Sequence, residues 1–280
     1  MRTLSAARVA AAVTEAAVRA ATELPADVVL ALKRALGSER EPVARTVLER
    51  ILANADCART GGIPLCQDTG LQVVLIEQGA DVRIRGDLAR AVAQGTARAT
   101  KQAALRASVV ARPGDTRRNS GDNTPPLMLH ETVPGDRVTV TVLPKGGGAE
   151  NKSRLGMLLP TAGWPGIREF VVETVRAAGG DACPPLVVGV GVGGSFDRCA
   201  HLAKRALFRP LTRRNADAVL RAEEARLLSM LNDLKIGPLG FGGRTTALAV
   251  QIMAEPCHIA SLPVAVNINC HATRRASVTL

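Results

Sequence analysis

The first 56 residues follow a helical pattern of apolar and polar positions. Apolar residues and alanines recur every three or four positions through residues 9–21, 28–36 and 43–53. Gly37 and Ser38 supply a helix stop and a new N-cap between the second and third of these stretches. The pattern therefore predicts an N-terminal helical segment over residues 1–56.

Strand and helix patterns are mixed in the remainder of the chain. Apolar or alternating runs predict strands over residues 71–77, 127–133, 137–143, 186–190 and 247–254. The second and third of these form a predicted pair joined at Pro134–Gly135. Helical periodicity predicts helices over residues 88–106, 167–178, 196–207 and 216–232. Because strands and helices do not alternate strictly, we expect an α+β fold with small mixed sheets surrounded by helices.

The chain shows no internal repeat and no linker of disordered composition. Its 280 residues are 46% hydrophobic and 22% charged, which is ample material for a buried core. We therefore predict a single domain over residues 1–280, with the helical segment 1–56 as a lobe within it.

No segment has the composition of a membrane anchor or a secretory signal. The longest uncharged runs reach about 15 residues, whereas a membrane-spanning helix needs about 20. Arg2, Arg8, Glu15 and Arg19 interrupt the alanine-rich start of the chain, so the apolar core of a signal peptide is missing. The sequence predicts a cytoplasmic protein that does not bind membranes.

The formal net charge is +11, a positive excess that nucleic-acid-binding proteins also show. The chain has one Trp, four Phe and no Tyr, so few side chains are present that could stack on bases. No run of basic residues is longer than two. The charge therefore favours a negatively charged small substrate or an acidic partner chain over nucleic acid.

Cysteines are the first candidate ligands for a metal. The chain contains Cys57, Cys66, Cys183, Cys199, Cys257 and Cys270. Without a secretory signal we expect free or metal-bound thiols, and no CxxC pair defines a zinc site. Cys66, Cys183 and Cys270 lie in loop-forming sequence beside polar residues. Cys199 lies within a predicted helix, where a small buried side chain is the usual interpretation.

A glycine-rich run offers a competing interpretation. Gly189, Gly191 and Gly194 match GxGxxG after an apolar strand and before a helix, as in dinucleotide-binding folds. Such a fold needs a second strand with an acidic residue about 20 positions later, but the sequence there is helical and basic. An NAD-binding oxidoreductase that uses Gly189–Gly194 is therefore the alternative function.

Seven motifs follow one another in the order found in a known enzyme family. They are PLCQDTG, LRASVV, RRNSGDNTPP, KGGGAENKSRLGML, ACPPLVVGVGVGGSFDRCAHLAKRAL, GFGGRTTALAV and PCHIASLPVAVNINCHATRRAS. Together they resemble the α subunit of the class I, iron–sulfur fumarate hydratase and L(+)-tartrate dehydratase family. The resemblance implies a fold like the N-terminal domain of class I fumarases. It also implies a hydro-lyase acting on a C4 dicarboxylate, either fumarate and malate or L(+)-tartrate, which is converted to oxaloacetate.

The resemblance also implies a cofactor. Members of this family hold an oxygen-sensitive 4Fe–4S cluster with three cysteines, and the motifs place these ligands at Cys66, Cys183 and Cys270. Cys57, Cys199 and Cys257 are then not ligands. A cluster with three thiolates leaves one iron open, and an open iron can act as a Lewis acid on a substrate hydroxyl.

The family motifs assign further roles. Asp68 and His258 are the candidate catalytic residues, although Asp68 in this loop is equally suited to closing an Asx-turn before Gly70. The candidate substrate-binding residues are Gln67, Arg106 and the backbone N–H of Gly148.

The substrate-binding arginine has two competitors. Arg106 occupies the matching place between the first two cysteine motifs, and its planar guanidinium can bind a carboxylate with two parallel hydrogen bonds. Arg117 and Arg118 are the alternatives.

A second chain is implied by comparison with the longer members of the family. In single-chain enzymes, a C-terminal domain supplies further cations and the base that removes the C–H proton. Here the chain ends at Leu280, shortly after the last motif. The resemblance therefore implies a separate β subunit, in a heterodimer or heterotetramer.

Overall fold

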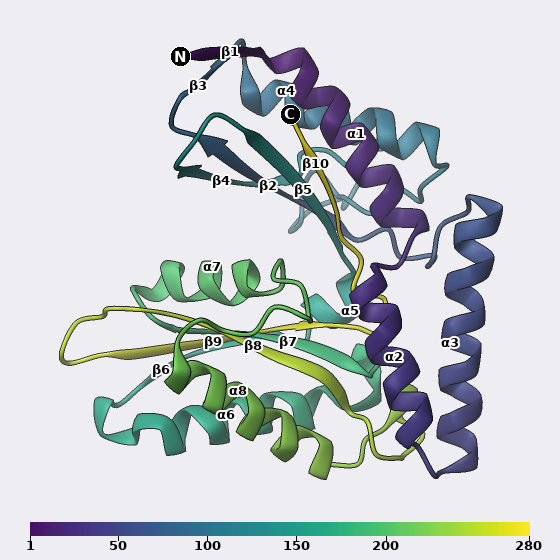
Figure 1. Cartoon of the computed structure of the whole chain (residues 1–280), viewed down its shortest axis with the longest axis vertical. Coiled ribbons are helices and arrows are strands. Elements are labelled where there is room, and N and C mark those ends of the chain that lie inside the picture. Colours follow the sequence, from purple (N-terminus) through teal and green to yellow (C-terminus); the bar gives the residue numbers. More distant parts are fainter. The chain divides into compact units, whose positions relative to one another are not determined.

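The chain divides into two compact units, each built from segments that are far apart in the sequence (Figure 1). The computed structural model describes residues 1–280. Unit 1 contains Met1–Pro25, Asn54–Gly147 and Arg274–Leu280, and unit 2 contains Ala26–Ala53 and Gly148–Thr273. The single domain predicted over residues 1–280 stays a prediction. Two compact units form one domain if they unfold together in a single transition.

Unit 1 is organised around a four-stranded mixed sheet. Its strand order is β10–β5–β2–β4. The strands are β2 (Leu71–Gly79), β4 (Leu127–Val133), β5 (Val138–Lys145) and β10 (Ala276–Thr279). β2 pairs in parallel with β4 and antiparallel with β5, and β10 is antiparallel to β5.

The predicted pairing of residues 127–133 with 137–143 is wrong, although both strands exist. β4 and β5 do not pair with each other, because β2 lies between them. Val73, Val74, Leu75 and Ile76 of β2 are at most 1% exposed. A strand that is apolar on both faces is most stable at the centre of a sheet. There, neighbouring strands form hydrogen bonds with both of its edges.

Helices cover the sheet of unit 1. The helices are α1 (Ala6–Thr22) and α4 (Leu88–Gln102). A short strand precedes each helix, β1 (Arg2–Ser5) before α1 and β3 (Val82–Arg85) before α4, and these two strands pair in parallel. Val9 and Val13 of α1 are fully buried against the sheet. Gly95 of α4 lets the two helices approach closely, because a Cβ there would lie 2.6 Å from the carbonyl oxygen of Ala10.

Unit 2 contains the second four-stranded sheet, with the order β6–β9–β7–β8. The strands are β6 (Arg154–Leu158), β7 (Leu186–Gly193), β8 (Ala247–Glu255) and β9 (Leu262–Asn269). β9 is antiparallel to β6 and β7, and β7 is parallel to β8. Neither β6 nor β9 was predicted from the sequence, although β9 is buried over seven of its eight residues.

Helices cover both faces of this sheet (Figure 1). α6 (Gly163–Ala178) and α8 (Ala218–Asp233) pack on one face in the main core of the unit. α7 (Phe196–Ala206) packs on the other face, where Cys199 and Ala203 meet Ala265. Short helices complete the loops: α5 (Gly147–Glu150), η1 (Pro160–Ala162), η2 (Gly179–Ala182) and η3 (Pro238–Gly240).

The predicted N-terminal helices are confirmed, but they do not form a lobe of their own. α1 belongs to unit 1 and α2 (Ala26–Ser38) to unit 2, while α3 (Pro42–Gly61) contributes residues to both. The α+β class is confirmed. No helix of the chain combines the length and apolar character that crossing a bilayer requires.

The first two glycines of the repeat serve packing, whereas Gly194 lies in the turn between β7 and α7 with a φ of +67°. Gly189 and Gly191 lie inside β7 and are buried. A Cβ on Gly191 would lie 2.1 Å from the carbonyl oxygen of Cys199, and one on Gly189 would lie 2.2 Å from that of Ala203. The glycines therefore let α7 sit directly on the strand. The tight glycine turn that a dinucleotide-binding site needs at the end of its strand is not formed by these two residues.

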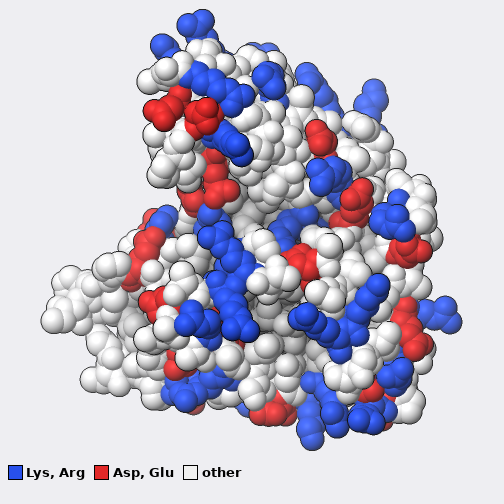
Figure 2. Space-filling view, in the orientation of Figure 1, with Lys and Arg blue, Asp and Glu red and all other residues white.

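Basic residues outnumber acidic ones in the chain, 36 against 25. In the space-filling view, acidic side chains lie among the basic ones on the face shown (Figure 2). Several of the arginines are paired with acidic residues one helical turn away, as in Arg59 with Asp56 and Arg176 with Glu173. Exposed pairs of this kind contribute little to stability but reduce the local charge.

Candidate functional site

The CQDTG loop of unit 1 joins α3 to β2 and is closed by its own aspartate. Oδ1 of Asp68 accepts a hydrogen bond from the N–H of Gly70 at 2.9 Å, which is the predicted Asx-turn. Oδ2 of Asp68 accepts from the N–H of Gly147 at 2.7 Å. The carboxylate therefore ties the cysteine loop to the glycine-rich segment that follows β5.

Gly70 is required by this arrangement. Its φ is +71°, and a Cβ would lie 2.3 Å from the carbonyl oxygen of Lys145. The loop thus lies against the end of β5. In addition, Nη2 of Arg274 donates to the carbonyl oxygen of Asp68 at 2.8 Å, so the last segment of the chain also holds the loop.

Cys66 is half-buried in this loop. Its sulfur accepts a hydrogen bond from the N–H of Asp68 at 3.4 Å, and the thiol reaches Oε1 of Gln67 at the same distance. Gln67 itself is exposed. Backbone N–H groups directed at a ligating sulfur are one of the means by which proteins tune iron–sulfur clusters.

Three buried polar residues lie close to the loop, and no role was predicted for any of them from the sequence. Gln72 and Lys145 are each 1% exposed, and Arg274 is 2% exposed. Both amide atoms of Gln72 and Nε of Arg274 have no hydrogen-bond partner. The sequence could have indicated these residues. Gln72 is a polar residue within an apolar strand pattern, Lys145 directly follows one, and Arg274 lies in the last family motif.

In unit 2 the structure brings two of the predicted ligands together. Cys183 precedes β7 and Cys270 follows β9, and these strands are antiparallel, with Val187 opposite Asn269. The N–H of His271 donates to the carbonyl oxygen of Cys183 at 3.0 Å, and Nδ1 of His271 lies 3.1 Å from the same oxygen. The two cysteine loops are therefore fastened to each other.

The backbone of Cys183 is unusual. Its φ and ψ are 54° and 62°, in the left-handed region that non-glycine residues rarely adopt. The thiol is exposed, whereas that of Cys270 is half-buried. Left-handed residues other than glycine are concentrated at functional sites, where surrounding contacts compensate for the strain.

Gly148 lies beside the Cys183 loop. It is exposed, and a Cβ on it would lie 3.6 Å from the carbonyl oxygen of Asp181. Asp181 accepts a hydrogen bond from Nζ of Lys152 at 2.8 Å. This hydrogen bond and the charge of Lys152 hold the pKa of Asp181 below its usual value. The glycine-rich segment thus contributes Gly147 to the site in unit 1 and Gly148 to that in unit 2.

Arg106 lies in the extended segment after α4, in unit 1. Its side chain is exposed, and its guanidinium forms no hydrogen bond or ion pair within the chain. Nδ2 of Asn123 donates to the carbonyl oxygen of Arg106 at 3.1 Å, and Oδ1 of Asn123 accepts from the N–H of Ser108 at 2.6 Å. The fully buried Asn123 therefore fixes the backbone of the arginine segment.

The alternative arginines lie in an exposed loop. Nη1 of Arg117 donates to the carbonyl oxygen of Pro113 at 2.8 Å, so this side chain helps to close the loop. Arg118 is exposed and contributes its backbone to the same loop.

The structure does not bring His258 to the cysteines of unit 2. His258 precedes β9 and Cys270 follows it, so the eight-residue strand separates them by about 26 Å at about 3.3 Å per residue. His258 is exposed at the turn between β8 and β9, and its Nδ1 accepts from the N–H of Ala260 at 3.1 Å.

The other cysteines lie elsewhere. Cys57 is exposed on α3, and Cys257 is exposed with its thiol 3.2 Å from the carbonyl oxygen of Ser261. Cys199 donates to the carbonyl oxygen of Gly191 at 3.2 Å, and burial raises its pKa to about 11, so it is a protonated thiol at neutral pH. Within neither unit do three or more His, Cys, Asp or Glu side chains gather as a metal-binding group.

Comparison with known proteins agrees with the motifs. Residues 10–279 match the family described as Fumarate hydratase (Fumerase). A Methanocaldococcus jannaschii protein assigned the name L(+)-tartrate dehydratase subunit alpha is 39% identical over 262 residues, which cover 92% of both chains. The L(+)-tartrate dehydratase subunit alpha of Escherichia coli K12 is 30% identical over 259 residues, covering 92% of this chain and 86% of that protein. The name of these relatives implies that they work with a second, β, subunit. This chain therefore belongs to the fumarate hydratase family of hydro-lyases, within which it is similar to the α subunits of L(+)-tartrate dehydratases.

Proposed function

We propose that this chain is the α subunit of a 4Fe–4S hydro-lyase that adds or removes water on a C4 dicarboxylate. The substrate is fumarate and malate, or L(+)-tartrate, the compound in the names of its relatives. The observation that carries the proposal is the joining of the Cys183 and Cys270 loops through His271. Cys66, in the CQDTG motif, is the third ligand of the proposed cluster.

The donor set fits an iron–sulfur cluster. Cys66, Cys183 and Cys270 are free thiols that lie in loops before or after strands, and none of them is fully buried. Thiolates are the usual ligands of such clusters. The buried cation of Arg274, with its unpartnered Nε beside the Cys66 loop, suits an anionic group. When bound, the cluster would supply one open iron as a Lewis acid for the substrate hydroxyl.

Asp68 has two tasks in this proposal. Its carboxylate holds the loop by accepting hydrogen bonds from Gly70 and Gly147. A carboxylate offers about four acceptor positions, so Asp68 keeps the capacity to accept a proton from the substrate hydroxyl.

Arg106 is proposed to bind a substrate carboxylate. Its exposed guanidinium has no competing partner in the chain, and its backbone is fixed by Asn123. Gln67 and the N–H of Gly148 would add neutral donors for the same dianion. His258 is left out of the proposed machinery, because it lies far along β9 from Cys270 of its own chain.

The β subunit is proposed to complete the site. Elimination of water next to a carboxylate needs a base for the C–H proton and cations for the charge that develops. The residues assigned to the site above include a single arginine, Arg106, and none of them is assigned as the base for the C–H proton. The fold assigned by resemblance, that of the N-terminal domain of class I fumarases, agrees with a chain that supplies part of a site.

The ligand assignment is tested by anaerobic reconstitution. Single Cys→Ser changes at Cys66, Cys183 or Cys270 should remove most of the bound iron and sulfide and the broad visible absorbance of the cluster. Cys57→Ser and Cys257→Ser are the controls, because these thiols are exposed, as that of Cys183 is, but are not proposed as ligands. The controls should load iron like the unmodified chain. Equal iron loss in all five variants would refute the assignment.

A further inference from the structure

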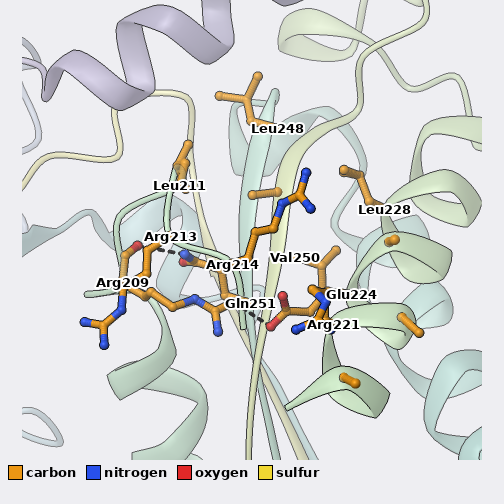
Figure 3. A pocket seen from close by; sticks show the side chains of 14 residues that line it. Arg209, Leu211, Arg213, Arg214, Arg221, Glu224, Leu228, Leu248, Val250 and Gln251 are labelled. Carbon is orange, nitrogen blue, oxygen red and sulfur yellow. Dashed lines mark hydrogen bonds and ion pairs between the residues drawn. The ribbon is translucent and has the colours of Figure 1, made fainter. Parts of the chain in front are cut away.

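A basic pocket lies in unit 2, and none of the residues assigned to the proposed reaction lines it. It is bordered by the edge strand β8, the N-terminal half of α8 and the segment 209–214, and its volume is about 560 Å³ (Figure 3). Sites for small molecules usually measure about 300–1,000 Å³. The pocket is therefore large enough for a metabolite.

Four arginines line this pocket, and only one carboxylate does. The arginines are Arg209, Arg213, Arg214 and Arg221, and the carboxylate is Glu224 (Figure 3). Oε1 of Glu224 accepts hydrogen bonds from Arg209, from Nδ2 of Asn215 and from the N–H of Ile252. The carboxylate of Glu224 is thus paired with Arg209 and hydrogen-bonded to the backbone of β8.

The other three guanidinium groups have no negative partner. Arg213 and Arg214 are exposed and their guanidinium groups form no hydrogen bond or ion pair within the chain. Arg221 donates from Nη1 to the carbonyl oxygen of Asn215 at 2.8 Å, so its charge is not neutralised. Like charges gathered in one concave surface raise the local concentration of anions.

The remaining lining of the pocket adds apolar surface to the positive charge. The N-terminus of α8 is already capped by the carboxylate of Asp217, which accepts hydrogen bonds from the N–H groups of Val219 and Leu220, so the arginines and not the helix end supply the positive potential. Leu211, Leu228 and Leu248 provide an apolar wall. Gln251 is 2% exposed and its Nε2 donates to the carbonyl oxygen of Arg209 at 2.7 Å, which fixes the start of the arginine segment.

We infer that this pocket binds a small organic anion that carries at least two neighbouring negative charges and an apolar portion. Arginine forks bind phosphate and carboxylate groups equally well in geometry. The charged end would lie against Arg213, Arg214 and Arg221, and the apolar portion against the leucines. The site is additional to the hydro-lyase site proposed above and does not depend on it.

The test is isothermal titration of the full chain with pyrophosphate, citrate and ATP at a fixed ionic strength of about 0.1 M. At least one probe should bind with one site per chain. The double variant Arg213→Ala/Arg214→Ala should weaken that binding about tenfold or more, because charge-assisted hydrogen bonds are lost. Both side chains are exposed and form no hydrogen bond or ion pair, so the thermal midpoint of unfolding should not change.

The matched control is the double variant Arg176→Ala/Arg226→Ala. It removes the same charge from exposed arginines of unit 2 that do not line the pocket. Its affinity should stay within about twofold of the unmodified chain. Tighter binding of pyrophosphate or of citrate would identify phosphate or carboxylate as the charged group, and either result supports the site. Absence of binding by all three probes, or equal losses in both double variants, would overturn the inference. Where pyrophosphate binds more tightly than citrate, ATP that binds no more tightly than pyrophosphate would overturn it as well.

Discussion

At the scale of single residues, Asp68 links three segments that are distant in the sequence. Its side chain accepts from Gly70 and Gly147, and its backbone oxygen accepts from Arg274. The sequence alone left two interpretations of this residue, a proton carrier and a turn former. The contacts confirm the turn and leave the proton transfer as a proposal. For Arg106 the proposed role is binding of a substrate carboxylate, and Arg117 and Arg118 are the alternatives for this role.

We expect Arg106→Ala to raise the KM for the dicarboxylate about tenfold or more, because two charge-assisted hydrogen bonds to a carboxylate are lost. Arg117→Ala and Arg118→Ala should change KM little, since Arg117 is engaged with Pro113. The measurement is anaerobic steady-state kinetics of the reconstituted α–β enzyme. A larger rise in KM for Arg118→Ala than for Arg106→Ala would transfer the role to Arg118.

At the scale of elements, close packing of α7 on β7 depends on glycines inside the strand. Gly191 faces the carbonyl oxygen of Cys199, with no room for a methyl group. Glu39 fastens another pair of elements. Its Oε1 accepts from the N–H groups of Arg40 and Glu41 after α2, and its Oε2 accepts from the N–H of Arg244 at 2.7 Å.

Gly191→Ala should lower the free energy of unfolding by about 1–3 kcal/mol or more, because helix and strand must separate to admit the methyl group. Gly37→Ala is the matched control. Gly37 lies in α2 with nothing within 4 Å of an added Cβ, so this change should stabilise the chain by about 0.5–1 kcal/mol. Denaturant unfolding measures both. An unchanged stability for Gly191→Ala would contradict the packing argument.

The contacts of Glu39 predict a pH dependence. Burial acts to raise the pKa of Glu39, but the hydrogen bonds from Glu41, Arg244 and Arg40 outweigh it and leave the pKa below the usual 4.5. A carboxyl whose folded pKa is depressed stabilises the fold above its unfolded pKa, and this contribution is lost as the pH falls through the folded value. The difference in unfolding free energy between the unmodified chain and Glu39→Gln should therefore be constant above pH 5 and shrink below about pH 4.5. A constant difference down to pH 3 would show that ionisation of Glu39 is irrelevant.

At the scale of the whole molecule, the main question is which parts of the active site this chain supplies. The relatives it resembles over 92% of its length are named α subunits. Its own side chains offer thiols, a positioned carboxylate and an exposed arginine, and the base for the C–H proton is proposed to come from the β subunit. Its positive charge of +11 suits an acidic partner or a dianionic substrate.

We therefore expect the reconstituted chain alone to load a cluster but to give no turnover of malate, fumarate or L(+)-tartrate. Addition of the β subunit should restore activity and produce a heteromer that is separable by size. Anaerobic assays of each chain alone and of the mixture make the comparison. Full turnover by the α chain without a second polypeptide would refute the proposal of a shared site.

Most elements of the fold followed from local sequence. The helices α1, α4, α6, α7 and α8 and the strands β2, β7 and β8 begin and end within a few residues of the predicted limits. Periodicity and turn residues act within a few positions of the chain, so they determine where an element lies. The predicted 4Fe–4S ligands and the hydro-lyase class came from motifs, because the spacing of six cysteines alone did not single out three of them.

Tertiary structure decided the rest. Local sequence placed β4 and β5 next to each other, but burial of the more apolar β2 between them gave the lower free energy. A glycine pattern that suggested a nucleotide turn is an adaptation to the contact between α7 and β7. The buried Gln72, Lys145 and Arg274 acquired their place only when segments 70 to 200 residues apart folded into one unit. Local preferences determine elements, whereas pairing, burial and the meeting of distant loops depend on which long-range contacts remove the most apolar surface from water.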